Sequence, residues 1–380
     1  MNQQLNPDTE PNNPPRADQL QFLRFLAFML IFLWHADLYA PDWLPGGYGA
    51  ANAVSFFIIL SGFVSGYSSY SRDITCSFRE IIRYMWHKII RIYPLYLTVT
   101  LFSVFMTDLP HYIASHSYPE ARYLCKELLK HLLMIQSWFP QNYFMYTGVG
   151  WFLSTIMLLY LINIPLRACA TRIRKSEHAT VIFISIAVLA ASSTVIYSLL
   201  MRGTYMEFTA YVLPVSRIGE YVCGMSLGYA IHNVSASINR QQRPCLPVIL
   251  TLLEAASFIV WICMMYAPVQ DWTVRTVHWL IPNILLLVIF GFGGGYISHA
   301  FRFKPLIWLG DISFECFLIH RMIIEEYMRN TATESTGFPG DVFAVMICLI
   351  ITILSAIAAH SFNTMTAMRH AAAKQKGLLK

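Results

Sequence analysis

Charged side chains are scarce in this sequence. Of its 380 residues, 13% are Asp, Glu, Lys or Arg, whereas 56% are apolar. Soluble domains contain about 25% charged residues, so this composition excludes an ordinary water-soluble protein. The sequence also has no long polar block, because apolar segments recur from residue 22 to residue 362 with short interruptions. We therefore predict one membrane domain rather than several soluble domains.

Motifs that would hold a metal or a nucleotide are missing as well. The sequence contains no HExxH, no cysteines at CxxC or CxxxC spacing, no P-loop and no GxGxxG. We therefore expect no metal. The eight cysteines are expected to be small buried hydrophobes, because only Cys125 falls in a predicted outer segment and would have no disulfide partner there. The Gly-rich stretch 291–295 is interpreted as close helix packing inside an apolar span.

The N-terminal segment lacks the features of a signal peptide. Residues 1–19 are rich in Asn, Pro and Gln, with neither a basic start nor a small-residue cleavage site. They are interpreted as a disordered cytoplasmic tail. Residues 20–365 are assigned to the membrane domain and residues 366–380 to a basic cytoplasmic tail.

Long apolar runs predict an all-α bundle of about ten transmembrane helices. A helix of roughly 20 residues crosses the bilayer's hydrocarbon core of about 30 Å. The third run is short and is expected to begin earlier, in the amphipathic basic stretch 79–92. The runs cover residues 22–40, 48–67, 93–107, 148–166, 180–200, 211–231, 246–267, 278–298, 306–327 and 341–362.

The distribution of basic residues predicts the orientation. If the N-terminus is cytoplasmic, 19 of the 27 Lys and Arg residues fall on the inner side and 8 on the outer side. This asymmetry favours cytoplasmic N- and C-termini. It also explains the net charge of +6 without nucleic acid. The long outer connection 108–147 is expected to form a lid or an acceptor platform.

Two polar residues stand on the first apolar run, Arg24 at its inner end and His35 toward its outer half. Eleven residues at 100° each bring both side chains to within about 20° of one helix face, about 16 Å apart along the axis. They therefore face one groove at different depths. The structural alternative is an Arg that extends to lipid headgroups and a His that packs on a neighbour.

Six segments, in order, resemble the acyltransferase 3 family of integral membrane O-acyltransferases. The first is the Arg-x10-His spacing of Arg24 and His35. The others are FFIILSGFV (56–64), KIIRIYPLY (88–96), WFLSTIMLLY (151–160), RIGEYVCGMSLGY (217–229) and SFECFLIH (313–320). The chain departs from the family pattern where Thr155, Ile156 and Met157 follow Ser154, since many members have a Glu there. Lys88 replaces an Arg, which keeps the charge but loses the planar guanidinium.

The resemblance implies an acyl donor from the cytoplasm, acetyl-CoA, and a glycan hydroxyl as acceptor. His35 is the candidate general base, because the pKa of histidine lies near neutrality, and Arg24 would orient the donor. Lys88 and Arg91 would bind the donor's phosphates, with Ser61 and Tyr93 as further donor contacts. The alternative for Lys88 and Arg91 is the positive-inside rule alone.

Other residues of the six segments have both a functional and a structural interpretation. His320 is expected at the depth of His35, so the two either share a site or His320 only packs. Arg217 and Glu220 stand three apart and are expected to pair structurally. Residues 61–62 are interpreted as a helix break that admits a polar chain. Trp151 and Ser154 would shape the acceptor or donor channel.

The resulting hypothesis is an O-acetyltransferase that modifies a cell-surface or exported polysaccharide in the bacterial inner membrane. Its expected partners are acyl-CoA, a glycan or lipid-linked glycan acceptor and membrane lipids, with a second copy or polysaccharide-assembly proteins as further candidates and no nucleic acid. Two rivals stay open. One is a glycan permease or flippase, which would also line a cavity with polar residues. The other is an inactive scaffold.

Overall fold

The computed structural model describes residues 17–36, 49–110, 118–203, 205, 207–237, 245–265, 272–331 and 338–375. Regular structure in these residues is helical, as the sequence predicts, and no strand is present among them. The chain order is α1 (Gln19–His35), α2 (Gly49–Ser69), α3 (Phe78–Ser103), η2 (Val104–Asp108), α5 (Tyr118–Leu132), η3 (Gln136–Trp138), α6 (Gly150–Ile173), α7 (Ala179–Leu200), η4 (Glu207–Val212), η5 (Pro214–Arg217), α8 (Ile218–Ser237), α9 (Leu246–Met265), α10 (Trp272–Phe292), α11 (Tyr296–Phe301), α12 (Lys304–Asn330) and α13 (Phe338–Gln375).

Each of the ten apolar runs overlaps a helix, but fewer qualify as spans on their own. Among the described residues, six helices are long and apolar enough to cross a membrane: α2, Phe78–Met106, α6, α7, α9 and Val342–Met365 within α13. Two more are apolar but shorter, Gln19–His35 and His278–Phe292. Charged residues such as Asp311 and Glu315 lower the hydropathy of α12. The count of about ten and the orientation stay predictions.

Helix α3 begins before its apolar run, as expected. Its N-cap is Ser77, whose hydroxyl accepts a hydrogen bond from the Glu80 backbone N–H at 3.2 Å. Ser77 and Glu80 have the spacing of a capping box, which satisfies backbone groups that the first turn leaves unpaired. The basic segment 79–91 and the apolar segment that follows it therefore belong to one continuous helix.

Helix α2 is the most enclosed of the candidate spans. In it 78% of the apolar window is buried, against 44% or less in the other five. Its main neighbour is α8, which meets it along two glycines on each helix. A Cβ added at Gly62, Gly66, Gly224 or Gly228 would collide with a backbone carbonyl of the facing helix. This small-xxx-small pairing brings the two backbones together.

Three sequence interpretations are corrected by this packing. Residues 61–62 do not break α2, which is continuous from Gly49 to Ser69; the chain that approaches Gly62 is the backbone of α8. The stretch 291–295 does not lie inside one span, because α10 ends at Phe292 and Gly293 turns the chain with φ +59°. Five of the eight cysteines are exposed, because they face outward from the bundle rather than into it.

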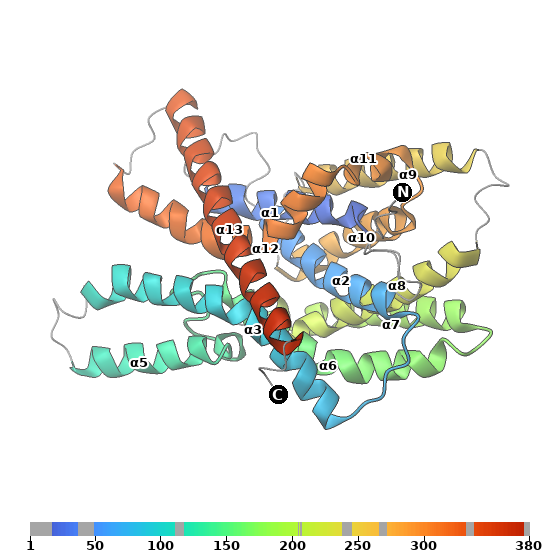
Figure 1. Cartoon of the computed structure of the whole chain (residues 1–380), viewed down its shortest axis with the longest axis horizontal. Helices are drawn as coiled ribbons and strands as arrows, with labels where there is room; N and C mark the ends of the chain where they lie inside the picture. The colour runs from blue at the N-terminus through green and yellow to red at the C-terminus, as the bar shows by residue number, and fades with distance from the viewer. Residues whose placement is uncertain are drawn as a thin grey trace.

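The outer connection forms a second layer against α3. Helix α5 lies beside the second half of α3 at the left of Figure 1, and the neighbouring parts of α12 and α13 extend from the same end. The hydroxyls of Tyr93 and Tyr96 donate to the carbonyls of Leu132 and His131 at 3.1 and 2.9 Å. Two tyrosines of α3 thus fasten this segment to the bundle.

The predicted tails are described only in part. The expected N-terminal tail, 1–19, lies outside the described residues as far as residue 16, and α1 begins at Gln19. At the other end, α13 continues to Gln375, so most of the expected tail 366–380 is helical.

Candidate functional site

A cavity of about 330 Å³ lies among six helices of the bundle. Small-molecule sites have volumes of about 300–1,000 Å³, so the cavity is large enough for part of a substrate. It is lined by Leu20, Gln21 and Arg24 of α1; Phe57, Leu60, Ser61, Val64, Ser65 and Ser68 of α2; Tyr84, Lys88 and Ile92 of α3; Phe152, Leu153, Ile156, Tyr160 and Arg167 of α6; Tyr221 of α8; and Ser313, Phe314 and Phe317 of α12.

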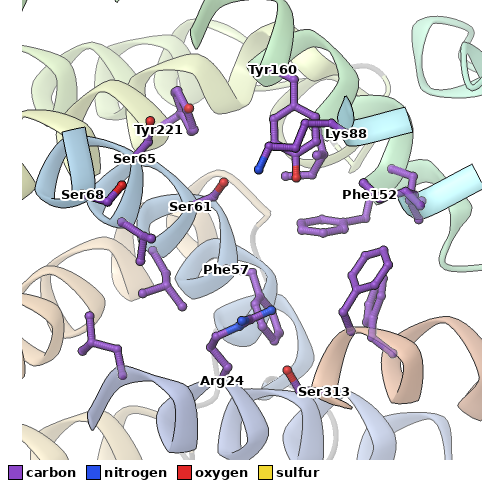
Figure 2. A pocket seen from close by; sticks show the side chains of 18 of the residues that line it. Arg24, Phe57, Ser61, Ser65, Ser68, Lys88, Phe152, Tyr160, Tyr221 and Ser313 are labelled. Atoms are coloured by element: carbon purple, nitrogen blue, oxygen red, sulfur yellow. The ribbon is translucent and has the colours of Figure 1, made fainter. Parts of the chain in front are cut away.

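Three cations line this cavity, and its described lining contains no Asp or Glu. They are Arg24, Lys88 and Arg167, each from a different helix. Figure 2 shows the Arg24 guanidinium and the Lys88 ammonium directed into the cavity from opposite walls. Like charges brought together at low dielectric repel one another unless an anion lies between them. The excess of positive charge on the lining favours a negatively charged ligand.

Neutral side chains contact Arg24 and Lys88, and the carboxylates of Asp311 and Glu315 lie close enough to Arg24 to interact with its charge. The Arg24 guanidinium donates to Gln21 Oε1 at 2.9 Å, one helical turn away. The Lys88 ammonium lies 5.3 Å from the ring centre of Tyr84 and 5.1 Å from that of Tyr160, which is within cation–π range. The Arg167 Nε is buried and has no hydrogen-bond partner among the described residues. Donor capacity is thus left for a ligand.

Hydroxyl groups form another part of the wall. Ser61, Ser65 and Ser68 of α2 face the cavity with Tyr221 (Figure 2). Asn163 fixes two of these groups, because its Nδ2 contacts Ser65 Oγ at 2.6 Å and also the Tyr221 hydroxyl. Ser61 was predicted to contact the acyl donor, and it lies on the same cavity wall as these hydroxyl groups.

The two predicted histidines are brought together from opposite ends of the sequence. The ring centres of His35 on α1 and His320 on α12 lie 5.1 Å apart. His320 is fully buried, whereas His35 is half-buried at the end of α1 and contacts the half-exposed Trp34. Neither histidine lines the cavity. Arg24 and His35 thus occupy different depths along α1, as their spacing predicts.

The hydrogen bonding of His320 fixes its tautomer. His320 Nδ1 lies 2.8 Å from the carbonyl oxygen of Phe317, which can only accept, so Nδ1 carries the proton. In the neutral ring the Nε2 atom then presents a lone pair. This atom is buried and has no hydrogen-bond partner among the described residues. This unpaired buried acceptor next to a second histidine is free to accept a hydrogen bond from a bound group.

Two predicted residues of the segment KIIRIYPLY (88–96) lie outside the cavity lining. Arg91 is exposed, although it is close enough to Lys88 and Arg24 to interact with their charges. Tyr93 donates to the Leu132 carbonyl and fastens the outer segment instead. The donor-binding roles assigned to both stay predictions, and the structure gives Tyr93 an additional structural contact.

The remaining predicted residues have mainly packing contacts. Trp151 is buried beside Tyr211, with ring centres 4.8 Å apart, and its carbonyl accepts a hydrogen bond from Ser137 at 2.7 Å. Ser154 is buried, and its hydroxyl has no partner among the described residues. Neither residue lines the cavity.

Arg217 and Glu220 form the ion pair that their spacing predicts. The Arg217 Nη1 and Glu220 Oε1 atoms are 3.0 Å apart, and both side chains are buried. Arg217 Nε also donates to the Tyr211 carbonyl at 2.8 Å, and Ser55 Oγ donates to Glu220 Oε1 at 2.6 Å. The pair therefore joins α2 to α8 away from the cavity.

Arg167 is the one of the three cavity cations that the sequence did not reveal. It belongs to a group of four basic residues, 167–175, that the positive-inside rule explains without a binding role. Arg167 lies near the end of α6, which continues past Pro165 and ends at Ile173. After Ser154, where many family members have a Glu, Thr155 donates to the Val212 carbonyl at 3.4 Å and Ile156 lines the cavity. No group of three or more metal-ligating side chains occurs in the described parts of the chain.

Tyr143, in the predicted outer connection 108–147, has a hydroxyl that stays neutral. Burial, and then the neighbouring Glu207, raise the pKa of Tyr143 to about 12. Its hydroxyl lies 3.5 Å from Glu207 Oε2, and its ring stacks on Phe208 with centres 5.7 Å apart. Tyr143 therefore stays a hydrogen-bond donor at neutral pH.

Comparison with known proteins yields one match. The family model described as an acyltransferase domain matches residues 18–360, nearly the whole chain. This range includes the cavity, its three cations and both histidines. No match is found among curated proteins or among solved structures.

Proposed function

Because this chain belongs to the acyltransferase 3 family, we propose that it takes an acyl group from cytoplasmic acyl-CoA and transfers it to a hydroxyl of a cell-surface or exported polysaccharide. The family and the apolar helices make it a multi-pass membrane acyltransferase. The acetyl group, the glycan acceptor and the bacterial inner membrane are the more specific parts of the proposal.

The single observation that carries the donor side is the cavity with three cations and no carboxylate among its described lining residues. Coenzyme A carries several phosphate charges, and charge-assisted hydrogen bonds from Arg and Lys to phosphate are among the strongest that side chains form. Arg24, Lys88 and Arg167 would bind those charges. On the predicted topology the cavity faces the cytoplasm, where acyl-CoA is made.

The histidine pair supports the acceptor side. His35 is half-buried at the predicted outer end of α1, so an acceptor hydroxyl would reach it before the buried His320. A sugar hydroxyl is a weak nucleophile at neutral pH and needs a positioned base. His35 would be this base, and the free Nε2 of His320 would accept a hydrogen bond that orients the reacting groups.

The reaction would then proceed by direct transfer. The hydroxyl oxygen attacks the thioester carbonyl as its proton moves to His35. A C–O bond forms, the C–S bond breaks, and the coenzyme leaves as a thiolate that takes up a proton. Arg24, about 16 Å from His35 along the helix axis, would hold the donor rather than the reacting carbonyl.

The test uses purified full-length protein, acetyl-CoA and an envelope-glycan extract, with thiol release and the glycan mass as readouts. With the wild type, the glycan should gain about 42 Da per acetyl group, because an acetyl group replaces a hydroxyl hydrogen. His35→Ala should lower kcat by roughly 100- to 10,000-fold, the usual contribution of a general base.

Arg167→Gln should instead raise the KM for acetyl-CoA by about tenfold or more, because a lost hydrogen bond to a charged group costs roughly 1.5–3 kcal/mol.

The matched control is His299→Ala, an exposed histidine on α11, which should leave both constants unchanged. Unaltered glycan masses with the wild type, both in this assay and in the native host, would overturn the proposal and favour transport or scaffolding. Normal transfer by His35→Ala would keep the enzyme but remove the assigned base.

A further inference from the structure

Three phenylalanine rings close the side of the cavity that faces the histidines. Phe57 of α2, Phe152 of α6 and Phe317 of α12 all line the cavity. Their ring centres are 6.4 Å apart for Phe57 and Phe152, 6.4 Å for Phe57 and Phe317, and 5.3 Å for Phe152 and Phe317. Because each ring contacts both others, they form a closed triangle, which we call the aromatic collar.

The aromatic collar lies between the cavity and His320. The Phe317 ring lines the cavity on one side, and its centre is 6.0 Å from that of His320 on the other. The Phe317 carbonyl also accepts the bond that fixes the His320 tautomer. Phe152 and Phe317 are 8% and 5% exposed, and Phe57 is half-buried. A group carried from the cations toward the histidine pair would therefore meet Phe317 and the two rings that contact it.

The collar's chemistry suits an alkyl group of limited size. Its rings come from three different helices, so none can move far without disturbing the packing of its own helix. Behind the collar, Phe28 and Phe32 enclose His320 with ring centres at 5.7 and 6.3 Å. Each additional methylene of an acyl chain would need volume that these rings already fill.

We infer that Phe57, Phe152 and Phe317 select the acyl group by size, admitting a two-carbon acyl chain and excluding longer ones. This inference rests on the proposed function, because it assumes that the cavity receives an acyl thioester. It adds the feature that sets acyl chain length, which neither the family match nor the cation-lined wall specifies.

The experiment compares kcat/KM for acetyl-CoA, butyryl-CoA and hexanoyl-CoA, with glycan mass as the readout. Phe152→Ala and Phe317→Ala should raise the hexanoyl-to-acetyl ratio of kcat/KM by tenfold or more, because an apolar site discriminates one methylene by roughly 10- to 200-fold. The leucine variants at both positions, and Phe57→Leu, should shift the same ratio in the same direction by less, and they remain informative if an alanine variant does not fold.

The control is Phe183→Ala, a buried ring on α7 that stacks on Tyr229 away from the cavity. It should lower stability but keep the wild-type ratio, which separates size selection from general loosening of the bundle. A wild type that transfers acetyl, together with folded collar variants that keep its ratio, would overturn this inference alone. A wild type that already prefers hexanoyl would also overturn it. No transfer of any acyl group by the wild type would overturn the proposed function.

Discussion

Two Arg–Glu pairs with the same i,i+3 spacing have opposite surroundings. Arg217 and Glu220 are 1% and 0% exposed, whereas Arg329 and Glu326 are 43% and 37% exposed. A buried charge is tolerated only when its partners replace water, and the Tyr211 carbonyl and the Ser55 hydroxyl supplement the first pair. The two pairs should therefore differ greatly in what their loss costs.

Removing one member of the buried pair should destabilise the protein strongly. Glu220→Gln leaves the Arg217 charge buried without its counter-ion, which costs roughly 3–5 kcal/mol in soluble proteins. Glu326→Gln should change the free energy of unfolding by less than about 0.5 kcal/mol, because both members of the exposed pair are accessible to solvent. Thermal unfolding of the detergent-purified variants measures both. Equal melting temperatures would show that the buried pair is not a structural link between α2 and α8.

At this scale the sequence predicted some contacts but not which side chains line the cavity. The pairing of Arg217 with Glu220 followed from helical periodicity, and axial rise placed His320 at the depth of His35 while leaving open whether it shares a site or only packs. Arg167 was missed because a basic residue at a predicted inner helix end has an adequate topological explanation. Its direction into the cavity depends on how α6 packs, and local sequence does not specify this.

Helices α2 and α8 show how small side chains set an interhelical distance. Gly62 and Gly66 face carbonyls of α8, while Gly224 and Gly228 face carbonyls of α2. In a bilayer, helices associate through close packing rather than through the hydrophobic effect, so these four contacts have unusual weight. They also position Ser61 and Tyr221 on neighbouring parts of the cavity wall.

A single methyl group at this contact should separate the helices. Gly224→Ala would place its Cβ against the Ile59 carbonyl and should cost about 1–3 kcal/mol of stability, the usual cost of overpacking. Gly49→Ala is the matched control on α2, since its Cβ would only touch Leu30 at 3.6 Å. Melting temperature measures stability, and acetyl-CoA affinity reports on the cavity. A Gly224→Ala protein as stable as Gly49→Ala would contradict the role of this contact.

Element boundaries were predictable where a local signal exists. The early start of α3 followed from its basic amphipathic segment, and the Ser77–Glu80 cap provides the physical reason. Residues 61–62 were misinterpreted because a Ser–Gly step can either bend a helix or admit a neighbour. The second glycine pair, on a helix about 160 positions away, decides between the two.

At the scale of the whole molecule, basic residues rather than packing indicate the orientation. The excess of Lys and Arg on one side is the physical basis for predicting cytoplasmic termini. The all-helical class followed directly from composition, because backbone groups in lipid must be paired within the segment. The span count did not, since α8 and α12 combine polar residues with burial inside the bundle.

Cysteine labelling can test this orientation. Cys76, between α2 and α3, and Cys125, on α5, are both exposed and should lie on opposite sides of the membrane. In single-cysteine proteins, a membrane-impermeant maleimide should label Cys125 in intact cells and Cys76 only after permeabilisation. Buried Cys348 should react in neither state. Labelling of Cys76 but not Cys125 in intact cells would reverse the predicted topology.

The cation-lined cavity has a consequence for the protein's own folding. When it is empty, Arg24, Lys88 and Arg167 repel one another across a space with no carboxylate among its described lining residues. The proposed polyanionic donor would reverse that interaction and would bind only the folded bundle, so at one hundred times its dissociation constant it would add about 2.7 kcal/mol to stability. The protein would be most fragile between turnovers, and the cytoplasmic donor concentration would set how much of it persists in the membrane.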